Sequence, residues 1–115
     1  MSIERKKVGP RLSQAVVHGD TVYTAGVVAE HPTADAAAQA GQILAQIDKL
    51  LADCGSDKSK LLTATIWLAD IRYFDEINSV WDKWVVPGQT PPRACVEARL
   101  ANPKYLVEIR VVAAR

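Results

Sequence analysis

The chain contains few of the residues that build metal sites or covalent cross-links, since its 115 residues include two Cys and two His. Cys54 and Cys95 alone do not make the disulfide framework of a small secreted domain, so both are expected to be free thiols of a reducing compartment. His18 and His31 lack clustered partners at the spacing of a metal-binding motif. The sequence therefore predicts no metal site.

The sequence also lacks a charge excess, a long apolar run and a Gly-rich phosphate loop. A net charge of +1 argues against a general nucleic-acid-binding protein, which would carry a basic face. No apolar run is long enough to span a bilayer, and residues 1–7 lack the apolar core of a secretory signal. These absences predict a cytoplasmic protein with neither a nucleic-acid nor a membrane partner.

The remaining composition, 49% apolar and 23% charged, is that of one globular domain over residues 1–115. Residue periodicity predicts the order β-β-α-β-α-β-β. The expected strands cover residues 13–18, 21–28, 60–69, 93–100 and 104–114. One helix should begin at a cap formed by Thr33 or Asp35 and end at Gly55, and another should span about residues 73–85. Right-handed crossovers would put both helices on one face of a single sheet, in an α+β fold.

The last predicted strand is apolar on both of its faces. Val107, Ile109 and Val111 alternate with a second set that includes Leu106 and Val112. This pattern is typical of a sheet that is buried on both sides. Because the helices cover only one face, we expect another copy of the chain to cover the second, which predicts a homo-oligomer.

An arginine, a thiol and a glutamate lie within the last two predicted strands. Arg93 and Cys95 are two residues apart and so share a face, and Glu108 lies in an otherwise apolar strand. The planar fork of an Arg suits a carboxylate, and a Glu in such a strand is either paired or kept for chemistry. The pattern indicates a site for a small carboxylate-bearing molecule. Alternatively, Arg93 is a surface residue, Cys95 a buried structural thiol and Glu108 the partner of Arg93 or of an arginine at position 99 or 110.

The order and spacing of these segments resemble the reactive intermediate deaminase (RidA-like, YjgF) family over nearly the whole chain. The most specific segments are residues 92–97 (PRACVE) and 107–109 (VEI). Further matches are residues 9–10 (GP), 19–23 (GDTVY) and 25–26 (AG), with Phe74 and Asn78. The resemblance implies a chorismate-mutase-like fold with one mixed sheet, and a homotrimer with sites between subunits. It also implies hydrolysis of enamines and imines such as 2-aminoacrylate to 2-oxo acids and ammonia, without a cofactor.

The resemblance assigns roles to four residues of this chain. The family's carboxylate-binding Arg falls on Arg93, its site Cys on Cys95 and its water-orienting Glu on Glu108. Asn78 matches a further substrate-site Asn. Arg93 and Glu108 are thus the expected catalytic residues, and Arg93, Cys95 and Asn78 the expected substrate-binding residues. No His near Cys95 in the sequence could act as its base, so a Cys nucleophile is not favoured.

Two positions differ from the pattern of the deaminating members. Leu12, with Arg11, replaces a usual Tyr, and Ala25 replaces a usual Ser, so two pocket hydroxyls are lost. The leading hypothesis is a hydrolase resembling 2-iminobutanoate/2-iminopropanoate deaminase, and Glu108 favours it. The alternative is a non-catalytic trimeric module that binds 2-oxo acids or related small metabolites, and Leu12 and Ala25 favour that reading.

Overall fold

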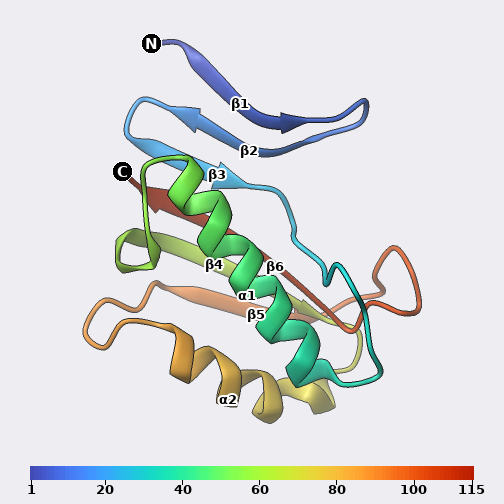
Figure 1. The fold of residues 1–115 in the computed structure, drawn as a ribbon. Helices are drawn as coiled ribbons and strands as arrows, with labels where there is room; N and C mark the ends of the chain where they lie inside the picture. Colours follow the sequence, from blue (N-terminus) through green and yellow to red (C-terminus); the bar gives the residue numbers. More distant parts are fainter.

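A computed structural model describes all residues, 1–115, as one mixed six-stranded sheet with two helices (Figure 1). The strands are β1 (Ile3–Val8), β2 (Ser13–His18), β3 (Thr21–Thr24), β4 (Leu61–Leu68), β5 (Arg93–Glu97) and β6 (Val107–Ala114). The helices are α1 (Ala36–Asp53) and α2 (Phe74–Trp84), and short 3₁₀ helices span Lys58–Lys60 and Ile71–Tyr73. The strand order is β1-β2-β3-β6-β4-β5, and only the β4–β5 pair is parallel. No helix is both long and apolar enough to cross a membrane.

The predicted α+β arrangement is confirmed, but the predicted number of strands is wrong. The sequence pattern indicated five strands, whereas β1 adds a sixth at the edge of the sheet, antiparallel to β2. Its sequence, IERKKV, has no apolar alternation because all of its side chains except Lys6 are exposed. Backbone hydrogen bonds to β2 hold this strand, and a charged, solvated edge needs no apolar face.

Helix α1 has the predicted start and a well-defined end. Asp35 is its N-cap, and the carboxylate accepts hydrogen bonds from the Ala37 and Ala38 N–H groups at 3.0 and 3.4 Å. At the other end Gly55 adopts a φ of 77°, and the Ser56 N–H donates to the Leu51 carbonyl at 2.8 Å. This is the left-handed termination for which glycine is preferred.

A buried glutamine ties α1 to the segment that leads into β6. The Gln39 side chain is fully buried and donates to the carbonyls of Thr33 and Lys104 at 2.6 and 2.9 Å. Its carbonyl oxygen accepts from the Leu106 N–H at 2.9 Å. Since Leu106 directly precedes β6, these bonds fix where the strand that carries Glu108 begins.

The two faces of the sheet differ in what covers them. On β6, Val107, Ile109, Val111 and Ala113 are fully buried in the core beneath the helices. The alternating residues of β6, including Glu108, point to the opposite face, where no other element of the chain packs. The predicted two-sided character of β6 is therefore visible in the fold, and the cover of its second face by another copy remains a prediction.

Candidate active site

Arg93 opens the edge strand β5 and faces the helices. It lies beside Ala64 of β4, whose side chain is buried in the core, so the two share the helix-covered face. The Arg93 Cζ atom is 5.4 Å from the ring centroid of Trp81 and 5.8 Å from that of Phe74. The guanidinium forms no ion pair and no side-chain hydrogen bond within the chain. Its N–H donors are therefore free to bind a carboxylate.

Asn78 lies on the same stripe of α2 as the two rings that contact Arg93. It follows Phe74 by four residues and precedes Trp81 by three, a spacing that puts all three on one side of a helix. Its side chain is half-buried and makes no hydrogen bond within the chain. Arg93 and Asn78, two of the sequence-predicted binding residues, thus belong to one region between β5 and α2.

Cys95 lies on the same face of β5 as Arg93 and packs against the core. Burial raises the pKa of the Cys95 thiol, and the positive charge of Arg93 only partly opposes this shift. The thiol is therefore protonated at neutral pH, which makes it a poor nucleophile. The geometry suits Cys95 as a lining group of the site.

Glu108 lies on the opposite, open face of the sheet, next to a β-bulge. Tyr23 pairs with Val112 and Val27 pairs with Ile109, so residues 24–26 oppose only residues 110–111. A bulge of this kind re-aims the backbone, and such bulges are common beside active sites.

The bulge brings Gly26 against the Glu108 side chain. A Cβ built at Gly26 would lie 2.9 Å from the Glu108 Cδ atom and closer still to the carboxylate oxygen Oε2. Only glycine leaves room for the carboxylate in this position. Glu108 forms no ion pair, so the alternative that it pairs with Arg93, Arg99 or Arg110 within the chain is wrong.

One chain does not bring Arg93 and Glu108 together. Arg93 faces the helices from β5, whereas Glu108 faces away from them on β6, and β4 lies between the two strands. Because the sheet separates the two side chains, a site that uses both must take them from different copies of the chain.

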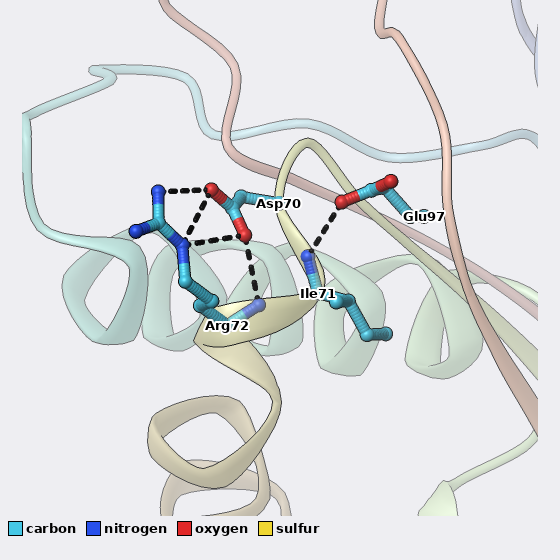
Figure 2. Close-up of polar contacts among 4 residues, drawn as sticks. All are labelled: Asp70, Ile71, Arg72 and Glu97. Carbon is cyan, nitrogen blue, oxygen red and sulfur yellow. Dashed lines mark hydrogen bonds and ion pairs between the residues drawn. The ribbon is translucent and has the colours of Figure 1, made fainter.

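The loop between β4 and α2 is fixed by two carboxylates (Figure 2). Asp70 accepts from the Arg72 backbone N–H at 2.9 Å and pairs with its guanidinium, whose hydrogen bonds hold the pKa of Asp70 below its ordinary value. Glu97, at the end of β5, accepts from the Ile71 N–H at 3.0 Å. Glu97 thereby anchors the 3₁₀ turn directly before the helix that carries Phe74, Asn78 and Trp81.

No group of three or more His, Cys, Asp or Glu side chains is arranged to hold a metal ion. The helix-covered side of the sheet carries a guanidinium, an amide and a thiol, and the open face carries the Glu108 carboxylate. Such groups can bind a carboxylate, polarise a bound group and exchange protons with water.

Comparison with known proteins places this arrangement in a family. A family model described as Endoribonuclease L-PSP matches residues 4–115. The chain is 49% identical over 114 residues to the RutC family protein YoaB of Escherichia coli, which covers 99% of both chains. It is also similar to a crystal structure of a YjgF family member from Neisseria meningitidis, with a TM-score of 0.97 and 47% identity over 100% of this chain and 96% of the other. The chain belongs to the YjgF/RutC family.

A more distant YjgF/RutC relative supplies the link to the Rid proteins. The structure of YyfA from Yersinia pestis, described as a member of the conserved Rid protein family, has a TM-score of 0.87 and 27% identity over 94% of this chain and 90% of that chain. The resemblance stated from the sequence motifs is therefore confirmed at the level of the family.

The two positions that depart from the expected deaminase pattern lie in different parts of the chain: Ala25 is in the bulge segment, and Leu12 is in the turn between β1 and β2. The Ala25 N–H donates to the Gln14 carbonyl at 2.8 Å, and Ala25 directly precedes Gly26. Leu12 is half exposed, and its carbonyl accepts from the Gly9 N–H at 2.9 Å. Of the two, only Ala25 adjoins the Gly26 position that faces Glu108.

Sequence reasoning missed two contributions to the site. The motif at residues 25–26 was noticed, but nothing in it indicated that Gly26 makes room for Glu108. Phe74 entered only as a match to the family and Trp81 had no predicted role, although both rings lie at cation–π distance from Arg93. Their seven-residue spacing on a helix that precedes an Arg-led strand was the available signal.

Proposed function

We propose that this protein is a cofactor-free hydrolase of small enamines and imines that carry a carboxylate, acting as a homotrimer with its sites between subunits. One observation carries the proposal. Arg93 and Glu108 are both partly buried, and neither has an ion-pair partner within the chain. They lie on opposite faces of the sheet, as two halves of a site completed by a neighbouring copy would.

In the proposed reaction Arg93 binds the substrate carboxylate through its two-pronged fork. Asn78 and the Cys95 region line the same half of the site. The partner copy supplies Glu108, which orients a water molecule toward the iminium carbon and accepts its proton as the C–O bond forms. Glu108 then passes this proton to the nitrogen of the carbinolamine. It takes the hydroxyl proton as the C=O bond forms and the C–N bond breaks, and the released ammonia accepts that proton and leaves as ammonium with the 2-oxo acid. Holding water and substrate together removes much of the entropic barrier.

The test is the decay of imines generated in place by an amino-acid oxidase. We expect faster decay and faster release of the 2-oxo acid with the wild-type protein than in a protein-free control. The Arg93→Ala variant, checked for intact assembly, is the matched control. Decay no faster than in the protein-free reaction would reject the proposed hydrolase.

A second candidate is a non-catalytic module that binds 2-oxo acids. The observation that favours it is that Leu12 and Ala25 lack the hydroxyl groups that the resemblance led us to expect at these two positions. It predicts thermal stabilisation by a 2-oxo acid without any acceleration of imine decay. The same two measurements therefore separate the two candidates.

The description of the matched family model names an endoribonuclease, and the chain offers less support for that activity. Its net charge is +1, whereas proteins that grip RNA need a basic surface to neutralise phosphates. Incubation with single-stranded RNA should leave the RNA intact.

A further inference from the structure

We propose that Trp81 and Phe74 form an aromatic seat that sets the orientation of the Arg93 guanidinium before substrate arrives. Both rings lie within 6 Å of its Cζ atom, at 5.4 and 5.8 Å. In the proposed reaction both rings act through Arg93, so they are positioning residues. The catalytic consequence of this inference rests on the proposed function, but the seat itself does not.

The aromatic seat orients Arg93 and leaves its N–H donors unoccupied, which an acidic partner would not do. A carboxylate beside Arg93 would orient it but would also occupy the N–H donors that the substrate needs. The face of an aromatic ring attracts the guanidinium without accepting those in-plane donors. A free Arg side chain samples many rotamers, so holding it in one orientation in advance lowers the entropic cost of binding.

The ring of Trp81 is itself held in place by its neighbours. It is 6% exposed and packs on Trp84, with the ring centroids 5.4 Å apart and the planes tilted by 46°. The Trp84 indole N–H in turn donates to both carboxylate oxygens of Asp48 on α1, each at 3.1 Å. The orientation of Arg93 is thus linked to the packing of α2 on α1.

Phe74 has a different environment from Trp81. It is 38% exposed and lies at the first position of α2, directly after the loop that Glu97 anchors. We infer that Trp81 is the fixed part of the seat and that Phe74 covers the guanidinium at the solvent side. Removing Phe74 should therefore disturb the core less than removing Trp81.

The test compares Trp81→Leu, which removes the ring, with Trp81→Phe, which keeps one, and with Phe74→Leu at the exposed position. The first readout is the NMR shift of the Arg93 Nε–H group, which ring currents displace in the wild type. The second is the affinity for a 2-oxo acid by calorimetry, together with KM and kcat for imine hydrolysis. We expect Trp81→Leu and Phe74→Leu to move the Nε–H signal toward that of a solvated Arg, and affinity to fall about 3- to 30-fold.

The expected kinetic signature is a rise in KM with a smaller change in kcat, and Trp81→Phe should recover most of the loss. Two variants expected to fold serve as the decisive ones: Phe74→Leu, and the double variant that combines Phe74→Leu with Trp81→Phe. If the Arg93 Nε–H signal and the affinity are unchanged in both, the aromatic seat is overturned. The same result is then expected for Trp81→Leu where it folds. If the wild type does not hydrolyse imines but the signal and the affinity respond as expected, the hydrolase proposal fails and the seat stands.

Discussion

Arg93 and Glu108 lie on opposite faces of one sheet, on strands that β4 separates. Neither has a charged partner in its own chain. If both act on one substrate, the functional unit is the contact between two copies. The first prediction follows from this geometry.

Mixing two inactive variants should restore activity. Arg93→Ala and Glu108→Gln each remove one half of the proposed site, but a mixed trimer contains interfaces with an intact Arg93 and an intact Glu108. For random assembly from equal amounts, about a quarter of the interfaces should be complete. The measurement is imine hydrolysis after the variants are unfolded together and refolded, with light scattering to verify the trimer mass. No recovery in verified mixed trimers would contradict a shared site.

Substituting Arg93 should abolish carboxylate binding. We expect Arg93→Ala to lose about 2–5 kcal/mol of 2-oxo acid binding, because the ligand carboxylate would be left unpaired. Arg93→Lys should also bind poorly, since it keeps the charge but loses the planar fork. Calorimetry on variants with a wild-type assembly state gives the answer, and wild-type affinity in Arg93→Ala would mean that the site lies elsewhere.

Glu108→Gln should separate binding from turnover. The amide keeps the shape of the side chain but does not accept a proton from water, so kcat should fall about 10²- to 10⁴-fold. Affinity for the 2-oxo acid should stay close to that of the wild type. Turnover at the wild-type rate would remove Glu108 from the mechanism.

Gly26→Ala should reduce turnover with little effect on folding. The new methyl group would displace the Glu108 carboxylate, so we expect kcat to fall by on the order of tenfold. Because the displaced group is the mobile end of a side chain, the free energy of unfolding should change by less than about 1 kcal/mol. Gly41→Ala is the matched control. A Cβ at Gly41 would meet no atom within 4 Å, and Ala in a helix interior should add about 0.5–1 kcal/mol of stability without changing kcat.

Cys95 should be dispensable for catalysis. Its buried thiol should also lower the free energy of unfolding of the wild-type protein at alkaline pH. Burial raises the pKa of its thiol above the ordinary value of 9.0, so the folded state favours the neutral form. As pH rises through 9.0, the unfolded chain ionises first, and the free energy of unfolding decreases until the folded thiol also ionises. Unfolding of Cys95→Ala should therefore be less pH-dependent than that of the wild type between about pH 8 and about pH 10. Loss of turnover in Cys95→Ala, with assembly intact, would instead give the thiol a direct role.

Residues at helix ends were predictable, because the chemistry of one or two side chains decides where a helix begins and ends. Asp35 caps α1 as its side chain suggested, and Gly55 terminates that helix. The charged strand β1 could not be predicted, because an exposed edge leaves no apolar pattern in the sequence. The pairing of β1 with β2 depends on backbone hydrogen bonds, to which almost any residue contributes.

The same distinction applies to the site. Arg93, Cys95 and Glu108 could be singled out because their residue types are unusual in strands and their motif resembles a family. Periodicity says that Trp81 is buried but not which cation lies over its ring. The contact of Gly26 with Glu108 depends on a bulge between residues distant in the sequence, which no local pattern encodes.

The two edges of the sheet carry a consequence for solubility. One edge is β1, which carries a run of four charged side chains at residues 4–7. The other edge is β5, which is only five residues long and follows Pro91 and Pro92. Charged residues, prolines and short length all hinder the addition of further strands. Sheet extension into fibrils is thus disfavoured at both ends, so the proposed association of copies would use the face that carries Glu108 and not the edges of the sheet.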